Sequence, residues 1–411
     1  MAQTWTSSDP GITTHTARDG VVTPPLSFGA AWLLRMLRDG VPRTRSEIAE
    51  ITGLARSTVA QRVDALLSSD LVGAAGEARS TGGRPPTRFA FNPLARIVLA
   101  ADVGATHIHL AVTDLGANVL AEHHENLDIA LGPETVLSRV AEHGRRLIAE
   151  AGRPPDELVG IGVGLPGPVE HATGRPISPP IMPGWDGFDV PGFMQAEFDR
   201  ITVVDNDVNI MALGEHFSVY PDVANLVFVK VATGIGSGII IDGELRRGAQ
   251  GSAGDLGHLH VPHDEEVVCH CGNIGCLEAV ASGKAIAAKL RAAGIDADTS
   301  ADVVGLARAG SAETIPLVRD AGRMIGEVLA SVVSLLNPSV IVLGGPIAEA
   351  GEGLLAGVRE VVYRRSLPLA TQHLRIVRSQ LGDRSGAVGA AVELIEHVLD
   401  PDHIDALLKP T

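Results

Sequence analysis

The three cysteines of this 411-residue sequence all fall within eight residues, at Cys269, Cys271 and Cys276. Cysteine that is used nowhere else and is clustered in this way indicates metal binding rather than packing. Three thiolates and one imidazole complete a closed tetrahedral zinc site. The preferred fourth ligand is His258. The other candidates for the fourth ligand are His260, His263 and His270.

The cysteine cluster also has a plainer interpretation. It can consist of three reduced surface thiols in a loop, or of one disulfide with a spare cysteine. Under the zinc hypothesis the metal is structural, because a closed four-ligand site leaves no open position for chemistry. Zinc would then hold the carboxylates of Asp255 and Glu278, which bracket the cluster, in fixed positions beside a pocket.

The cellular location follows from what the sequence contains and lacks. Reduced, clustered cysteines agree with a cytoplasmic protein. No apolar run reaches the ~18 residues that are needed to span a bilayer, and the N-terminus has no signal-peptide pattern. We therefore expect a cytoplasmic protein with no membrane partner.

Charge is unevenly distributed along the chain. The net charge is −16, yet residues 27–96 hold ten arginines against six acidic residues, a local net charge of +4. A small basic module on an acidic body fits a DNA-binding domain joined to a ligand-binding domain. Residues 1–26 are polar and rich in Thr, Gly and Pro, which predicts a disordered arm. Residues 399–411 are expected to form a C-terminal tail.

Residues 27–93 have the pattern of a winged helix-turn-helix. Thr44 and Glu47 form a T-x-x-E capping box, which predicts the start of a helix. Its apolar side is expected to consist of Ile48, Ala49 and Ile51. Gly53 makes the turn to a second helix over about residues 56–66, whose buried positions are expected to be Val59, Val63 and Leu66.

The opposite face of this second helix carries side chains that can reach phosphates and base edges in a major groove. The expected DNA contacts there are Arg56, Ser57, Thr58, Gln61 and Arg62. A two-stranded wing with a basic tip follows, with Arg79 and Arg84 expected at phosphate or in the minor groove. The alternative is an ordinary small helical cap with solvated arginines.

Two hairpins with glycine-bearing turns lie about 130 residues apart in the rest of the chain. Such turns can hold a nucleotide phosphate through backbone N–H groups, and an aspartate can orient a hydrated Mg²⁺. The repeated hairpin indicates an internally duplicated α/β protein with a cleft between its lobes. The candidate nucleotide-binding residues are Asp102, Gly104 and Thr106 in the first turn, Thr233, Gly234 and Gly236 in the second, and Gly344 and Gly345 after a later strand.

A predicted strand over residues 201–204 is followed at its C-terminal end by Asp205, Asn206 and Asp207. Side chains at the carboxyl ends of strands line the crevice of α/β sheets. Asn206 can therefore bond a substrate hydroxyl, and Asp207 can accept its proton. The alternative for either residue is a helix N-cap without a role in binding.

The order of these motifs resembles the ROK family of repressors and sugar kinases. The motif C-x-C-G-x-x-G-C-x-E, matched by residues 269–278, is the most specific part of the resemblance, which extends over residues 97–398. The resemblance implies a two-lobed, actin-like (ribonuclease-H-like) α/β fold after the winged helix. It also implies that His258, in the family's G-E-x-G-H motif, completes the zinc site, which lies within 255–278. Here Asp255 stands at the Glu position of that motif.

The resemblance further implies a sugar site and, for a kinase, a catalytic base. The implied sugar contacts are Asn206, Asp207, Asp255, His258 and Glu278. Asp207 falls on the base of the kinases. Their first phosphate loop reads D-x-G-G-T-K, whereas this sequence has Ala105 and His107 at the second Gly and the Lys. The second loop is well matched.

These observations together predict a sugar-responsive DNA-binding regulator, acting as a repressor of carbohydrate-metabolism genes. The basic winged helix favours this function, because a kinase has no need of it. The expected partners are operator DNA, a sugar or sugar-phosphate effector, and a second copy of the chain in a homodimer or higher homo-oligomer. The competing hypothesis is an ATP- and Mg²⁺-dependent sugar kinase of the hexokinase or glucokinase type, and a third is a bifunctional protein.

Overall fold

The computed structural model describes residues 29–77, 85–262 and 266–407. Contacts divide the chain into two compact units, Pro93–Leu399 and a smaller unit that combines the residues up to Asn92 with those from Asp400 onward. The predicted disordered arm, residues 1–26, lies outside the described residues. Among the described helices, none has the length and apolarity to cross a bilayer.

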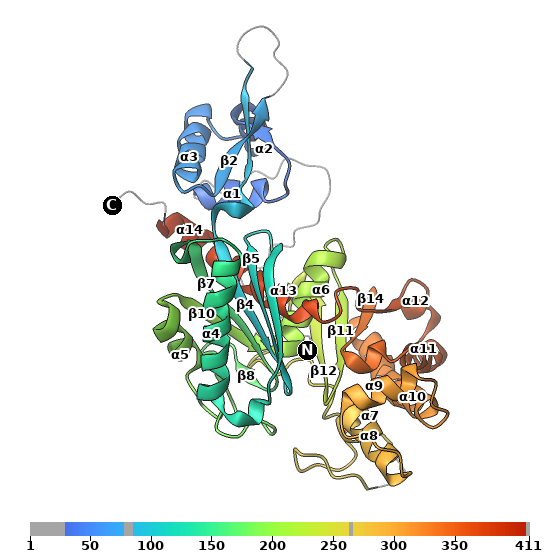
Figure 1. Cartoon of the computed structure of the whole chain (residues 1–411). Helices are drawn as coiled ribbons and strands as arrows, with labels where there is room; N and C mark the ends of the chain where they lie inside the picture. The colour runs from blue at the N-terminus through green and yellow to red at the C-terminus, as the bar shows by residue number, and fades with distance from the viewer. Residues whose placement is uncertain (1–28, 78–84, 263–265, 408–411) are drawn as a thin grey trace, which may run out of the picture. The chain divides into compact units, whose positions relative to one another are not determined.

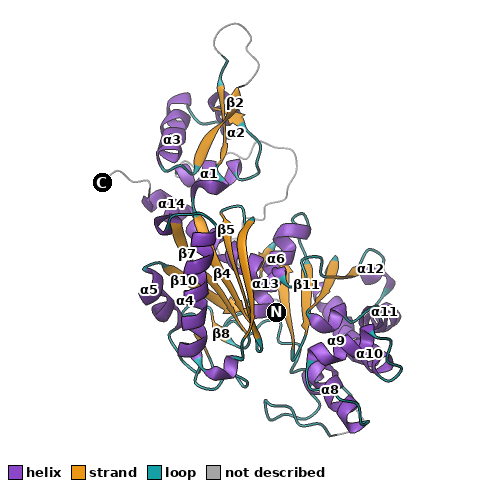
Figure 2. Cartoon of the chain, viewed as in Figure 1, coloured by secondary structure: helices purple, strands orange, loops and turns teal. Residues whose placement is uncertain are grey.

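The smaller unit contains four helices and one three-stranded sheet in its described part (Figures 1 and 2). The sheet has the strand order β1-β3-β2, and both pairings are antiparallel. The helices are α1 (Ala30–Leu37), α2 (Arg45–Thr52), α3 (Arg56–Ser68) and α14 (Pro401–Leu407), and the strands are β1 (Arg43–Thr44), β2 (Val72–Glu77) and β3 (Thr87–Phe91).

The helix-turn-helix forms for the local reasons that its sequence indicates. The backbone N–H of Thr44 donates to the Glu47 carboxylate at 2.7 Å, and the Glu47 N–H donates to Thr44 Oγ1 at 3.2 Å, so the capping box is present. Gly53 ends α2 with φ +67°. The expected apolar positions Val59, Val63 and Leu66 on α3 are fully buried.

The predicted apolar side of α2 is partly wrong. Ile48 is fully buried, but Ile51 is 44% exposed, and Thr52 takes the buried position instead. Thr52 can do so because its hydroxyl donates to the Ile48 carbonyl at 2.7 Å, which satisfies the buried polar group within the helix. The buried side of α2 therefore includes Thr52, one position after the predicted Ile51.

The C-terminal segment differs from the tail predicted for residues 399–411, because Pro401–Leu407 form α14. Proline is favoured at the first position of a helix, where its missing N–H costs nothing. α14 packs against α1. Asp405 accepts a hydrogen bond from the Ala31 N–H at 3.1 Å, and so it caps the start of α1 in place of a local capping side chain.

The larger unit contains two five-stranded sheets, one in each lobe (Figure 2). In both lobes the first strand pairs antiparallel with the second and parallel with the fourth, so the two sheets repeat one topology. The first sheet, in the order β10-β7-β4-β5-β6, consists of β4 (Ile97–Val103), β5 (His107–Asp114), β6 (Val119–Asn126), β7 (Leu158–Leu165) and β10 (Ile201–Asn206). The second, in the order β13-β12-β11-β14-β15, consists of β11 (Leu226–Val231), β12 (Ile235–Ile241), β13 (Glu244–Leu245), β14 (Val340–Gly344) and β15 (Arg375–Arg378).

Helices cover the outer faces of both sheets. In the first lobe α4 (Pro133–Glu150) and α5 (Val190–Phe198) bury their apolar sides against the sheet, together with Trp185, which is fully buried. All seven residues of β4 are buried, as expected of a central strand covered on both faces. The second lobe is covered by α7 (Leu277–Ala281), α8 (Gly283–Ala292), α9 (Ser300–Arg308), α10 (Thr314–Leu336), α11 (Gly353–Arg365) and α12 (Pro368–Thr371).

Two helices, α6 (Asp207–Val219) and α13 (Arg384–Val398), lie between the sheets and pack tightly on each other (Figure 1). Glycines allow the close approach. A Cβ on Gly389 would lie 1.6 Å from the Ile210 carbonyl oxygen, and one on Gly214 would lie 2.2 Å from the Ser385 carbonyl oxygen. Both obstacles are backbone atoms, so neither position tolerates a side chain without moving a helix.

We expect Gly389→Ala to lower the free energy of unfolding by about 3 kcal/mol, the upper end of the range for overpacked sites. Gly305→Ala is the matched control, because Gly305 is exposed on α9 and its Cβ would meet no atom within 4 Å. It should stabilise the protein by about 0.5–1 kcal/mol. Chemical denaturation of the parent and both variants measures the difference. Equal stability of Gly389→Ala and the parent would contradict the close crossing.

Candidate metal centre and inter-lobe pocket

The cysteine stretch folds as a small hairpin between β13 and α7. Val268 pairs with Ile274, and the Cys269 N–H donates to the Asn273 carbonyl at 2.7 Å. Gly272, with φ +88°, makes the turn that returns the chain toward Cys276. The sequence C-x-C-G-x-x-G-C thus folds into a turn that presents its sulfurs to one point.

The four predicted ligands converge, with their ligand atoms all within 4.8 Å of one another. The Cys269 Sγ to His258 Nδ1 distance is 3.6 Å, and the Cys271 Sγ to Cys276 Sγ distance is 3.7 Å. In a tetrahedral zinc site the Zn–S distance is about 2.3 Å and the Zn–N distance is about 2.0–2.1 Å. These distances require ligand atoms about 3.8 Å apart for two sulfurs and about 3.5 Å apart for a sulfur and a nitrogen. The donor set therefore has the size and chemistry of a metal site.

Among the described histidines, His258 alone groups with the three cysteines. All three thiols are free, and a sulfur separation of 3.7 Å is far beyond a disulfide bond of about 2.05 Å. Burial, together with the neighbouring thiols, raises the pKa of Cys276 to about 12, so a thiolate there needs the charge of a cation. His270 lies against the Lys284 ammonium at 2.9 Å, and His263 lies outside the described residues.

The cluster fixes one of the predicted sugar contacts. Cys276 precedes α7 directly, and Glu278 lies in its first turn. The Glu278 carboxylate accepts a hydrogen bond from the Ile235 N–H at 3.0 Å, at the start of β12. Asp255 is exposed, next to Gly254, whose carbonyl accepts from the Ser237 N–H of β12 at 3.0 Å. The cysteine cluster therefore directly precedes the helix of Glu278, and β12 contacts the segments that carry both carboxylates.

Asn206 and Asp207 occupy the start of α6 as predicted from the strand end. Asn206 is an N-cap, because its Oδ1 accepts from the Val208 N–H at 3.0 Å while its Nδ2 donates to the Gly167 carbonyl at 2.8 Å. Asp207 accepts from the Lys230 ammonium at 2.6 Å. Val208, the residue after Asp207, faces Gly236 of β12, two residues after Gly234, whose Cβ would meet the Glu278 carboxylate.

Lys230 is a site residue that the sequence analysis missed. It lies on β11 between buried residues, and its ammonium group faces both Asp207 and Asp102. Burial favours the neutral amine, but the charges of Asp207 and Asp102 raise the pKa of Lys230 above its usual value. A single lysine within the otherwise apolar strand LVFVKV was the available signal, because a buried charge requires a partner.

A pocket of about 510 Å³ opens beside this lysine, and we call it the inter-lobe pocket. It brings Asp102 and Thr106 of the first lobe together with Lys230 and Gly345 of the second. Asp102 Oδ1 is buried without a hydrogen-bond partner, and burial raises the pKa of Asp102 to about 6. An unpaired buried oxygen at this point indicates a place for a bound group.

The remaining candidate nucleotide residues have different surroundings. The ring of His107 covers Gly104, where a Cβ would meet it at 2.3 Å. In the second turn, which holds Thr233, a Cβ on Gly234 would meet the Glu278 carboxylate at 2.3 Å. This second turn therefore lies against Glu278, one of the sugar candidates.

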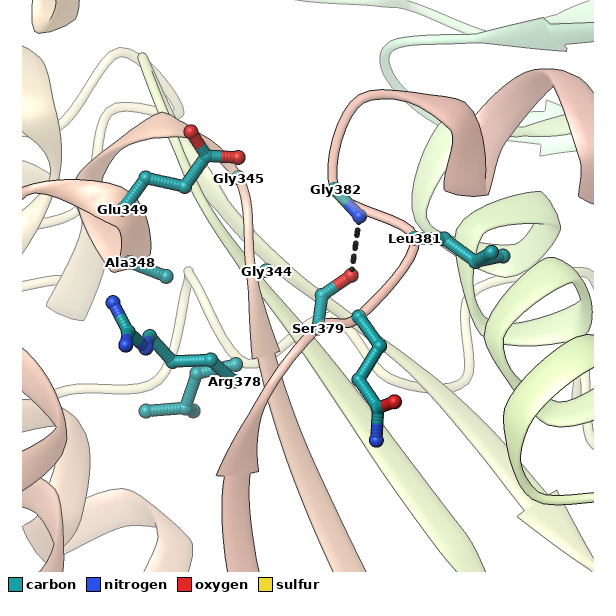
Figure 3. A pocket seen from close by; sticks show the side chains of 10 residues that line it. Gly344, Gly345, Ala348, Glu349, Arg378, Ser379, Leu381 and Gly382 are labelled. Carbon is teal, nitrogen blue, oxygen red and sulfur yellow. Dashed lines mark hydrogen bonds between the residues drawn. The ribbon is translucent and has the colours of Figure 1, made fainter.

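A neighbouring pocket of about 450 Å³ is lined by Gly344, Gly345 and the loop from Arg378 to Gly382 (Figure 3). Gly344 is required there because a Cβ would lie 2.3 Å from the Phe228 ring. Glu215 of α6 holds the loop in place. It is fully buried and accepts a hydrogen bond from Ser379 Oγ at 2.8 Å. Ser379 Oγ in turn accepts from the Gly382 N–H at 3.0 Å, the contact drawn in Figure 3.

An arginine that the sequence analysis did not single out connects the lobes. Arg247 follows β13 of the second sheet and donates to Asp205, at the end of β10, at 2.6 Å. It also donates to Glu393 of α13 at 2.7 Å. Both carboxylates are buried, and burial together with the charge of Asp205 raises the pKa of Glu393 to about 8. Asp205 directly precedes Asn206, so this ion pair lies beside the candidate sugar site.

The predicted DNA-reading residues lie on α3 of the smaller unit. Arg56, Ser57 and Gln61 are exposed, and Thr58 and Arg62 are half-buried. Their exposure leaves one side of the helix available for a groove. The wing arginines Arg79 and Arg84 lie outside the described residues.

A duplicated α/β unit with two like-folded lobes and a pocket between them defines the actin-like class of proteins. Residues 98–396 match the family described as the ROK family. The xylose repressor of Bacillus spizizenii is 30% identical over 369 residues, which cover 90% of this chain and 95% of that protein. The chain belongs to the ROK family.

Solved structures include both regulators and kinases of this family. A ROK family transcriptional regulator, a homologue of the E. coli MLC protein, is similar with a TM-score of 0.78 and 25% identity, covering 92% of this chain and 98% of that chain. A ROK family glucokinase from Streptomyces griseus, in complex with glucose and AMPPNP, is similar with a TM-score of 0.62 and 27% identity, covering 72% of this chain and 98% of that chain.

The raised pKa of Glu393 makes stability depend on pH. A carboxyl group that binds its proton more tightly when folded contributes stability below its unfolded pKa of about 4.3, and the contribution is lost as pH rises to about 8. We expect Glu393→Gln to flatten this decline, because glutamine keeps the shape without the charge. Urea denaturation of the parent and of Glu393→Gln between pH 5 and pH 9 measures the decline, with the exposed Glu134→Gln as control. Parallel curves for the parent and Glu393→Gln would contradict the assignment.

Proposed function

We propose that this chain is a sugar-responsive transcriptional repressor whose ROK unit binds a sugar or sugar phosphate and thereby lowers affinity for operator DNA. The observation that carries the proposal is a winged helix-turn-helix joined to a ROK unit in one chain. The similarity to the solved regulator covers 92% of the chain, more than residues 93–399 alone can provide, so it includes the smaller unit. A sugar kinase has no use for that unit.

DNA binding is assigned to α3. The exposed Arg56, Ser57 and Gln61, with Thr58 and Arg62 beside them, supply donors of the kind that read base edges and phosphates. Arg79 and Arg84 of the wing would add phosphate or minor-groove contacts. A homodimer would place two such helices on a near-palindromic site.

The sugar site is assigned to the region around the start of β12. Asp207 and Asn206 approach from α6, and Glu278 and Asp255 from the side of the metal cluster. His258 serves both functions: its Nδ1 faces Cys269, so a metal bound there leaves the Nε2–H free to donate to a hydroxyl. Several carboxylates on separate elements can each accept a hydrogen bond from one hydroxyl of a sugar ring, which gives selectivity.

Zinc is the proposed metal of the Cys269, Cys271, Cys276 and His258 cluster. Three thiolates and an imidazole in a tetrahedron of this size are typical of structural zinc. The ion would supply the charge that keeps Cys276 deprotonated, and it would hold α7 and Glu278 against β12. The chain's own residues then orient the sugar, with no chemistry at the metal.

The contacts between the two lobes are proposed to transmit the effect of sugar binding to the DNA-binding unit. Sugar bound at Asn206 and Asp207 adjoins Asp205, and Asp205 is held by Arg247 of the other lobe at 2.6 Å. A change in lobe closure would therefore alter the Arg247 ion pairs. The effector must then bind one lobe arrangement more tightly, and DNA the other. The resulting coupling free energy between the two sites is typically 1–3 kcal/mol.

The kinase hypothesis is disfavoured by the surroundings of its own residues. One oxygen of Asp207 is already paired with Lys230, and that ammonium would compete with a sugar hydroxyl for it. His107 stands at the Lys position of the kinase loop, and its ring covers Gly104. ATP and Mg²⁺ retain a candidate location near Asp102, whose unpaired oxygen lines the inter-lobe pocket, and near Gly344 and Gly345. We propose that phosphoryl transfer is absent or very slow.

The test of function uses the DNA site that the full chain selects from a random pool. Fluorescence anisotropy then follows release of that DNA by xylose, glucose, N-acetylglucosamine and their phosphates. One of these should release the parent protein from DNA. Asp207→Asn and Glu278→Gln should each weaken the response about tenfold or more, the effect of losing a hydrogen bond to a charged group. The exposed Asp222→Asn is the matched control and should respond as the parent does.

Two outcomes would overturn this proposal. The first is a DNA affinity that no sugar of the panel changes. The second is robust ATP-dependent phosphorylation of a sugar by the parent protein, abolished in Asp207→Asn, which would establish the kinase hypothesis instead.

Metal analysis tests the zinc assignment separately. Purified protein is expected to contain about one zinc ion per chain. Cys271→Ser should lose most of it, whereas His270→Gln, in the same hairpin but paired with Lys284, should retain it. Loss of zinc should weaken the sugar response more than the bare DNA affinity, because Glu278 is adjacent to the cluster. Zinc well below one per chain in the parent, or full zinc in Cys271→Ser, would refute the assignment.

A further inference from the structure

A second group of metal-binding side chains lies in the first lobe, on the strands β5 and β6. His109 of β5 is 1% exposed, and its Nδ1 lies 3.0 Å from the Asp383 carbonyl oxygen. A carbonyl can only accept, so Nδ1 carries the proton and Nε2 carries the lone pair. Nε2 is buried and has no hydrogen-bond partner. A buried imidazole with its tautomer fixed in this way is the arrangement that metal-binding histidines have.

Two further potential ligands lie beside this ring. The His124 ring stacks on its face and is exposed, so it can turn to direct a nitrogen toward an ion on Nε2. His124 of β6 lies directly opposite His109 in the strand register, and the two rings stack at 3.5 Å between centroids. Glu122 shares the face of β6 with His124, and its Oε2 lies 3.4 Å from His109 Nε2. The ligand atoms of all three residues lie within 4.8 Å of one another.

Glu122 already pairs with an arginine, and His124 is open to solvent. Arg384 donates to both oxygens of Glu122, with Nε at 3.0 Å from Oε2. A carboxylate oxygen has two lone pairs, so each oxygen can still bind an ion, and bound carboxylates are commonly oriented by such hydrogen bonds. His124 is exposed, which gives an ion a path from solvent.

We propose that His109, His124 and Glu122 bind one divalent transition-metal ion of the zinc, nickel or cobalt class, at a site separate from the cysteine cluster. Two imidazoles and one carboxylate suit these ions and exclude a preference for Mg²⁺ or Ca²⁺. His109 and His124 also line the inter-lobe pocket beside Lys230 and Gly345. The ion would thus connect β5 and β6 with the Asp383 segment that leads into α13, and it would stiffen the wall of the pocket between the lobes.

A neighbouring group of similar composition serves as an internal control. His123, Glu125 and His143 lie together on the other side of β6. There the Arg146 guanidinium lies 3.2 Å from His123 Nδ1. Arginine can only donate, so His123 Nδ1 accepts and its Nε2, which faces Glu125, carries the proton. That nitrogen has no lone pair for a metal, and the group is an ion-pair cluster with Arg139.

The experiment uses the full chain, without a histidine tag and with its zinc content measured. Ni²⁺ is titrated into the parent by calorimetry while a chromophoric indicator follows zinc release. We expect one Ni²⁺ per chain without zinc release, and an affinity at least about tenfold lower in His124→Ala. His123→Ala should bind as the parent does. His124 is exposed, so its variant should fold normally, and the buried His109→Gln provides a second test once its circular dichroism matches the parent.

The metal's ligands can be checked with Co²⁺ in the same protein. Binding at the histidine site should produce only weak visible bands, since the strong charge-transfer bands of cobalt require thiolate ligands. The proposal is overturned if Ni²⁺ does not bind, if it binds only by releasing zinc, if His124→Ala binds as tightly as the parent, or if Co²⁺ gives thiolate bands. None of these outcomes depends on DNA or sugar, so they leave the proposed function untouched.

Discussion

The close crossing of α6 and α13 is the contact on which the larger unit depends. Gly389 and Gly214 bring the two helices into backbone contact between the sheets. The crossing positions Asp207 at the start of α6 and Glu393 on α13. Asp102 is enclosed by it as well, because a Cβ on Gly386 of α13 would lie 1.9 Å from the Asp102 carboxylate. A small change in this crossing would therefore reach the sugar candidates, the Arg247 ion pairs and the inter-lobe pocket together.

The cysteine hairpin is the second structural feature that positions the candidate sugar residues. It differs from the α6–α13 crossing in the sequence distance that it connects. The hairpin is local, since the three cysteines and His258 lie within 20 residues, and it directly precedes the helix that carries Glu278. The α6–α13 crossing and Arg247 connect segments more than 140 residues apart. A ligand between them would be held on one side by a rigid support and on the other by elements that move with the lobes. This asymmetry suits a sensor, because binding free energy can then be used to change the lobe arrangement.

Features set by neighbouring residues were predictable from the sequence, and features set by distant residues were not. The capping box at Thr44 and Glu47, the convergence of the cysteines and the duplicated glycine hairpins all depend on short spacings. Ile51 was misassigned because Thr52 satisfies its own hydroxyl and becomes buried. Arg247 with Glu393, and His109 with Glu122, acquire their roles only when separate strands and helices meet. Asp405 caps a helix 374 residues away, so no local pattern at the C-terminus could indicate that contact.

The central claim is that sugar bound between the lobes and DNA bound by the smaller unit oppose each other. Thermodynamic linkage makes that claim reciprocal, so it can be tested from the sugar side. Isothermal titration calorimetry of the active sugar into the protein alone, and into the protein saturated with its selected DNA, measures the coupling directly. The account predicts that DNA weakens sugar binding by the same factor by which sugar weakens DNA binding, typically about 5- to 150-fold. Equal sugar affinity with and without DNA would contradict it.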